Sequence, residues 1–286
     1  MNKLQGLLRL IRPINCVMMG LAVLTGEILA YGTLYFPSSI FGFITAFTLT
    51  GASMITNDYW DRSVDAVNAP HRPIPSGVIS PQIALWSAFT LIVLGMGTAV
   101  GTNLACVVLA TFSITISLLY NYWGKKLGLW GNFMVSLCIA IPLIYGGFLS
   151  DHIQLNIEGL TLLLLFDLTV FFAITGREVN KDIVDVEGDT IRAIQTVAIR
   201  YGSKTAATLA SLFYLTAVVL SILPWGLKLT SWVYLLLVSI ADVGFIISAF
   251  ILLRDYSKEN AKKVKNMVLF WMLIALLAFL TGGIIR

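Results

Sequence analysis

Two groups of aspartates with identical spacing are the residues of this sequence best suited to chemistry. Both follow the pattern D-x₂-D-x₃-D, and their members are Asp58, Asp61 and Asp65 in the first motif and Asp182, Asp185 and Asp189 in the second motif. On an α-helix, positions i, i+3 and i+7 share one face, within about 60° of one another. Three carboxylates on one face repel one another, so each motif predicts a bound cation.

The chemistry that suits these carboxylates is magnesium-assisted cleavage of a diphosphate. Mg²⁺ prefers oxygen ligands, keeps several waters and is typically shared between one or two carboxylates and substrate phosphates. Two acidic faces around a diphosphate would hold metal ions that neutralise the charge developing as pyrophosphate leaves an allylic carbon. The allylic cation would then be captured by a nucleophile bound nearby.

A solvated acidic surface is the alternative interpretation of both motifs. Six of the 15 acidic residues lie in these two groups of equal spacing, which favours a shared site over a solvated surface. Glu178 lies one helical turn before Asp182 and, in one interpretation, extends the second motif.

Basic residues accompany both motifs and are candidates for phosphate contacts. A turn with three prolines, 68–77, follows the first motif; proline fixes φ, so this stiff turn can hold Asn68 and Arg72 over the aspartates. Arg is well shaped for phosphate. Further candidates are Lys125, Lys126, Arg177 and Lys181, although for Lys125 and Lys126 a role in membrane topology alone remains an equal alternative.

The elements that must position these residues are membrane-spanning helices. Hydrophobic residues make up 58% of the chain and charged residues only 12%. A helix needs about 20 mostly apolar residues to cross a bilayer. Nine segments qualify and predict an all-α polytopic protein with a single domain over residues 1–286: 14–35, 38–57, 82–101, 103–120, 131–149, 157–176, 204–223, 230–252 and 266–285. Ser80 and Pro81 are predicted to cap and start the third span.

The distribution of basic residues predicts the orientation of the nine spans. With a cytoplasmic N-terminus, 17 of the 19 Lys and Arg residues fall on the inner side, and only Lys228 and Arg286 fall outside. Both aspartate motifs then lie at the cytoplasmic edge of the cell membrane. Membrane lipids are the expected surroundings, and no nucleic-acid partner is expected.

Other sites are excluded or receive no role. Cys16, Cys106 and Cys138 lie in apolar segments without metal-ligand spacing and are expected only to pack. His71 and His152 fall on opposite sides of the membrane, so they cannot share a metal. The intramembrane acids are assigned nothing beyond lining an internal polar chamber; they are Glu27, Asp167 and Asp242.

The two motifs resemble those of a known family. NDYWDRSVDAVNAPHRPIPSG and DIVDVEGD are similar to the two signatures of the UbiA-type intramembrane prenyltransferases, and the resemblance covers the whole chain. It implies a bundle of nine helices around a central chamber, with both aspartate motifs binding Mg²⁺ and the diphosphate. It also implies further substrate-binding residues: Asn57 in the first metal–diphosphate site, Asn68, Arg72, Lys125 and Lys181 near the diphosphate, and Asn15 and Tyr145 in the chamber.

Within that family, GREVNKDIVDVEGD is most similar to the archaeal digeranylgeranylglyceryl phosphate synthases. This similarity implies transfer of a geranylgeranyl group from geranylgeranyl diphosphate to the hydroxyl of a lipid phosphate acceptor, geranylgeranylglyceryl phosphate. The first motif resembles the chlorophyll-synthase branch equally well. Alternatives are therefore a prenyltransferase for a quinone precursor, a haem or a chlorin, and, more distantly, an ion-coupled transporter. A CDP-alcohol phosphotransferase is disfavoured because its D-G-x-x-A-R stretch is absent.

Overall fold

Helices make up all the regular structure in the described part of the chain. The computed structural model describes residues 2–150, 157–191 and 194–285, apart from the side chains of Asn68 and Ile191; His152 and Arg192 therefore lie outside the described residues. Nine of the described helices are long and apolar enough to span a membrane, which confirms the predicted number. They are α2 (Pro13–Tyr31), α3 (Ser38–Trp60), α5 (Pro81–Val100), α6 (Leu104–Tyr122), α7 (Leu129–Gly147), α8 (Ile157–Ile191), α10 (Ser203–Gly226), α11 (Trp232–Arg254) and α12 (Lys258–Ile284).

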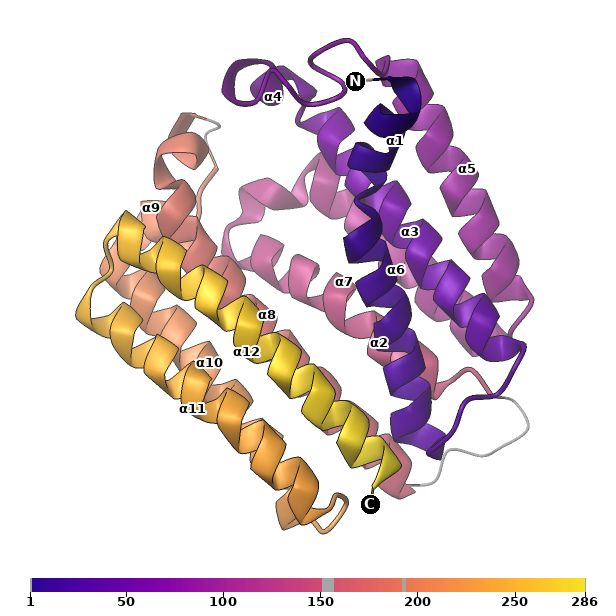
Figure 1. The fold of residues 1–286 in the computed structure, drawn as a ribbon. Coiled ribbons are helices and arrows are strands. Elements are labelled where there is room, and N and C mark those ends of the chain that lie inside the picture. Colours follow the sequence, from indigo (N-terminus) through magenta and orange to yellow (C-terminus); the bar gives the residue numbers. More distant parts are fainter. Residues whose placement is uncertain (1, 151–156, 192–193, 286) are drawn as a thin grey trace.

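Four shorter helices lie outside these spans: α1 (Lys3–Ile11), α4 (Arg62–Asn68), the 3₁₀ helix η1 (Gly124–Leu127) and α9 (Val197–Tyr201). The N- and C-terminal ends lie at opposite ends of the bundle, as nine spans require (Figure 1). Both α4 and α9 lie at the end that carries the N-terminus (Figure 1). The loops that join the spans through α4 and α9 therefore lie at one end of the bundle (Figure 1).

The spans close around a common centre. Helix α2 packs against α3 and α7, α8 packs against α7 and α10, and α12 packs against α11, α8 and α2. Helix α6 packs against both α3 and α7 and so belongs to this ring, whereas α5 packs on α3 at the outer edge of the bundle (Figure 1). Helices from both halves of the sequence thus share one interior.

Local sequence explains several helix ends. The Ser80 side chain accepts a hydrogen bond from the Ile83 amide (3.3 Å) and Pro81 occupies the first turn of α5, as predicted. The division between the third and fourth spans is made by Asn103, whose side chain accepts from the Cys106 amide (2.8 Å) and caps α6. The ninth span is longer than predicted, because the basic first turns that begin at Lys258 are already helical.

The helical prediction holds for one aspartate motif and is partly wrong for the other. Helix α8 continues without a break through the sixth span and the whole second motif. In the first motif α3 ends at Trp60, and Asp61 joins it to α4 with a ψ of −3°. That ψ departs from the helical value near −42°, so the helix is interrupted at Asp61, although Asp58 and Asp65 remain close enough for Arg72 to contact both.

Two glycines let the backbones of α2 and α7 touch. A Cβ at Gly146 would lie 1.9 Å from the Val23 carbonyl oxygen, and one at Gly26 would lie 1.9 Å from that of Leu143. Small residues at helix interfaces allow this close approach in membranes. The interior geometry of the bundle therefore depends on these two positions.

We expect Gly146→Ala to lower the melting temperature of the purified protein, because α7 must move away from α2; overpacking of this kind costs about 1–3 kcal/mol. Thermal unfolding in detergent measures the effect. The matched control is Gly97→Ala on α5, where an added Cβ meets nothing within 4 Å. Equal melting temperatures for the two variants would contradict the importance of this contact.

Candidate functional site

Arginines from two other segments surround the first motif. Asp58 and Asp65 are buried, with 5% and 3% of their surface exposed, which excludes a solvated acidic surface for them. Arg12 donates to Asp58 at 2.7 Å, while Arg72 pairs with Asp65 at 2.5 Å and lies 3.7 Å from Asp58. The stiff turn after the first motif therefore brings Arg72 over the aspartates, as predicted.

The middle aspartate of the first motif, Asp61, binds a lysine that follows α6 in the sequence. The Lys125 ammonium lies 2.7 Å from the Asp61 carboxylate, and η1 carries this lysine. The Asn57 amide lies 3.4 Å from the same carboxylate. The structure thus brings Asn57, Arg72 and Lys125 together with the first motif.

The second motif combines one buried carboxylate with two that are partly exposed. Asp182 is 8% exposed and accepts a hydrogen bond from the Asn132 amide at 2.8 Å. Asp185 and Asp189 lie on the next two turns of α8 and are partly exposed. Glu178, one turn earlier, is instead paired through its two oxygens with Arg177 (2.7 Å) and Lys181 (3.0 Å).

Two observations place both motifs next to the same segment of the chain. The segment from η1 to the start of α7 contacts both, because Lys125 binds Asp61 and Asn132 binds Asp182. Tyr120, at the end of α6, interacts electrostatically with Asp61 of the first motif and with Asp182 of the second. Both motifs therefore border the corner that α6, η1 and α7 form.

A largely apolar chamber lies next to this corner. It has a volume of about 540 Å³ and is lined by residues of α2, α3, α6, α7, α8, α11 and α12, among them Asn15 and Tyr145 as predicted. Ser53 and Arg177 also line it, and each lies five residues before the first aspartate of a motif, Asp58 and Asp182 respectively. The chamber therefore reaches to within about one and a half helical turns of both motifs.

The intramembrane acids do not line this chamber, which corrects the sequence-based expectation. Glu27 accepts from the Tyr35 amide at 2.9 Å, and Asp242 is bonded to the Ser221 hydroxyl at 2.9 Å. Glu27, Asp242 and Asp167 are all missing from the described chamber lining. Instead of an internal polar chamber, the described helices enclose a mainly apolar one.

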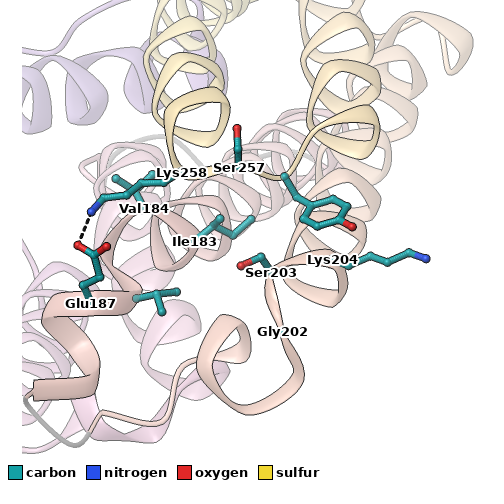
Figure 2. A pocket seen from close by; sticks show the side chains of 10 residues that line it. Ile183, Val184, Glu187, Gly202, Ser203, Lys204, Ser257 and Lys258 are labelled. Atoms are coloured by element: carbon teal, nitrogen blue, oxygen red, sulfur yellow. Dashed lines mark hydrogen bonds and ion pairs between the residues drawn. The ribbon is translucent and has the colours of Figure 1, made fainter.

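A second cavity of about 520 Å³ lies on another face of α8 (Figure 2). Its wall includes Ile183 and Glu187 of α8, Ser203 at the start of α10, and Lys258 at the start of α12. Lys258 forms an ion pair with Glu187, as Figure 2 shows. Since no aspartate of either motif belongs to its described wall, this cavity lies apart from the corner where the motifs meet.

The donor set at the motifs fits a hard divalent cation. In the described ranges, no three or more His, Cys, Asp or Glu side chains are grouped so as to hold a metal ion by themselves. Mg²⁺ needs only one or two carboxylates when water and phosphate oxygens complete its shell. The buried Asp58 and Asp182, on two different helices, suit metal ions shared with a diphosphate better than an all-protein cage.

Sequence reasoning missed two residues of this site. Arg12, the partner of Asp58, was counted only among the basic residues that set topology; its φ of 54° and the following Pro13 mark a sharp break between α1 and α2. Asn132 carries no signal beyond being a polar residue at the start of a span. The predicted Asn68 ends α4, but its side chain lies outside the described residues.

We expect Asn132→Ala to lower kcat/KM by about 10- to 100-fold, because the second motif predicts Asp182 as a metal ligand and losing the hydrogen-bond partner of such a carboxylate usually has this effect. The variant leaves Asp182 buried without its hydrogen bond. Product formation from labelled diphosphate measures the loss. Asn266→Ala, on an exposed position of α12, is the control, and an unchanged rate for Asn132→Ala would contradict the role of Asn132.

Comparison with known proteins agrees with this arrangement. The model of the UbiA prenyltransferase family matches residues 18–277. A digeranylgeranylglyceryl phosphate synthase from Methanosarcina barkeri is 34% identical over 96% of this chain and 97% of its own length, and one from Methanopyrus kandleri is 34% identical over 96% and 98%.

Solved structures agree as well. One, described as concerning digeranylgeranylglyceryl phosphate synthase in membranes, is 30% identical and covers 99% of both chains with a TM-score of 0.84. A UbiA homologue from Archaeoglobus fulgidus, bound to DMAPP and Mg²⁺, shares the fold at 15% identity, with a TM-score of 0.68 over 96% of this chain and 99% of that one. This multi-pass membrane protein therefore belongs to the UbiA prenyltransferase family.

Proposed function

We propose that this prenyltransferase moves a geranylgeranyl group from geranylgeranyl diphosphate to the free hydroxyl of geranylgeranylglyceryl phosphate, in archaeal ether-lipid synthesis. The observation that carries the proposal is that two aspartate motifs border one corner of the bundle, near an apolar chamber, with cations paired to the first motif. The names of the relatives from Methanosarcina and Methanopyrus support this donor and acceptor.

The residues of the two motifs would hold the diphosphate. Bound Mg²⁺ neutralises the negative charge on the departing diphosphate. The carboxylates of Asp58, Asp61, Asp65, Asp182, Asp185 and Asp189 are the proposed metal ligands. The cations now paired with them, Arg12, Arg72 and Lys125, lie where they can donate to phosphate oxygens instead.

The apolar chamber would bind the prenyl chain and keep water from the reacting carbon. The C1–oxygen bond of the donor breaks and its electron pair leaves with the diphosphate, which produces an allylic cation. The acceptor hydroxyl oxygen then forms the ether bond to C1, and its proton leaves to the released diphosphate or to water. An allylic cation is electrophilic enough to need no strong base, and excluding water prevents its hydrolysis.

The placement of the protein is part of the proposal. Residues 1–286 form one transmembrane domain in the cell membrane, with the N-terminus and the active site facing the cytoplasm. The concentration of basic residues at the end of the bundle that carries the motifs supports this orientation.

An acceptor panel tests the proposed function. Membranes with Mg²⁺ and labelled geranylgeranyl diphosphate are incubated with geranylgeranylglyceryl phosphate, an aromatic quinone precursor, a haem or a chlorin in turn. Labelled product is expected only with the lipid phosphate. Prenylation of another acceptor while the lipid phosphate stays unmodified would refute the proposal, and ion flux into liposomes that survives loss of Asp58 and Asp185 together would favour a transporter.

A further inference from the structure

One charged side chain faces the chamber. Among the described residues that line the chamber, Arg177 is the sole one whose side chain is charged at neutral pH. The other lining side chains are apolar or carry a hydroxyl, amide or thiol group. Its side chain is 20% exposed, and its Nε–H is buried with no hydrogen-bond partner in the described structure. A buried donor without a partner costs free energy, so this arginine is prepared to bind an anion in the chamber.

Glu178 holds this arginine in place. It is 6% exposed, and its two oxygens accept from the Arg177 guanidinium at 2.7 Å and from the Lys181 ammonium at 3.0 Å. One carboxylate thus orients two cations, of which Arg177 faces the chamber and Lys181 precedes Asp182. This pairing leaves the buried Nε–H of Arg177 without an acceptor, so the guanidinium can still donate to a further anion.

The acceptor supplies an anion of the right kind. The donor diphosphate already has Arg12, Arg72 and Lys125 at the first motif. A lipid acceptor built on glycerol phosphate brings a phosphate group in addition to the donor diphosphate. Because glycerol has three carbons, the carbon that carries this phosphate is at most two carbons away from the one that carries the reacting hydroxyl. It must therefore bind beside the donor C1, at the polar end of the chamber, where Arg177 lies.

We propose that Arg177 binds the phosphate of the acceptor and that Glu178 is a positioning residue that orients the Arg177 guanidinium. The inference rests on the proposed function and explains how a phosphorylated lipid is selected. Arginine suits the task because its planar guanidinium donates in parallel to two phosphate oxygens. An uncharged aromatic acceptor would leave this buried cation without its anion.

The test combines two enzymes with two acceptors. Wild type and Arg177→Gln are assayed with geranylgeranylglyceryl phosphate and with geranylgeranylglycerol, the same alcohol without its phosphate. In wild type, removing the phosphate is expected to lower kcat/KM by about 10- to 100-fold, the usual value of a charge-assisted hydrogen bond. In Arg177→Gln the difference between the acceptors should largely disappear, while the KM for the donor diphosphate stays near that of wild type.

Further variants separate recognition from folding. Glu178→Gln is expected to raise the KM for the phosphorylated acceptor more than the KM for the donor, and Arg177→Lys, which keeps the charge, should retain part of the discrimination even if Arg177→Gln folds poorly. Arg254→Gln, at the end of α11 with its guanidinium 4.2 Å from the Phe250 ring, is the matched control and should discriminate as wild type does.

Two results of these assays would overturn the proposed role of Arg177. An equal loss with both acceptors in Arg177→Gln and Arg177→Lys would assign Arg177 to the donor or to the fold and would overturn it. Failure of wild type to modify either glycerol acceptor would instead refute the proposed function, and the inference with it.

Discussion

Replacing Asp58 or Asp185 by Asn is expected to lower kcat/KM by about 10²- to 10³-fold, a loss typical of removing one group that stabilises charge in a transition state. Asn keeps the size of the side chain but removes the negative charge that would bind a metal ion. At Asp58 the change also takes away the counter-charge of Arg12, 2.7 Å away. Initial rates of product formation in detergent or proteoliposomes measure the effect.

Glu187→Gln is the matched control for Asp185→Asn. Glu187 lies two residues further along α8, is 80% exposed and pairs with Lys258 at the cavity of Figure 2 rather than with the motifs. An exposed ion pair of this kind contributes little to stability. We expect normal activity for Glu187→Gln, and normal activity for Asp185→Asn as well would exclude the second motif as a metal site.

Removing divalent cations is expected to abolish product formation, and adding Mg²⁺ back should restore it. Without the metal, the charge on the departing diphosphate would be met only by side chains such as Arg72 and Lys125. Rates are measured after chelation and again after titration with Mg²⁺. Turnover that continues in excess chelator would contradict metal-assisted cleavage.

Thermal unfolding of the same samples distinguishes loss of catalysis from loss of structure. Chelation alone should leave the melting temperature unchanged, because Asp58, Asp61 and Asp65 are each paired with a cation of the chain itself. Mg²⁺ together with a diphosphate should raise it, since a ligand that binds only the folded state stabilises that state.

The number of spans and both motifs could be predicted because each depends on neighbouring residues. Hydropathy over about 20 residues predicts a span, and the spacing of Asp182, Asp185 and Asp189 on a helix needs no information from elsewhere. The same reasoning was partly wrong for the first motif, because the helix is interrupted at Asp61, the junction between α3 and α4.

Side-chain partners could not be predicted in this way. Arg12 lies 46 residues from Asp58, and Asn132 lies 50 residues from Asp182. Glu178 shares a helical face with the second motif, yet it pairs with Arg177 and Lys181. These choices depend on which helices pack together and on which charges are buried with a partner.

The sequence by itself determined the all-helical membrane class, the nine spans, both aspartate motifs and the family. Each of these depends on local periodicity or on short runs of residues, so it could be predicted without knowing how the helices pack. Only the tertiary structure decided that both motifs border one corner of the bundle, that Arg12 and Asn132 bind their aspartates, and that a mainly apolar chamber lined by Arg177 lies nearby. The reason is that these features are made by contacts between helices far apart in the chain, such as α2 with α7 and α8 with α12.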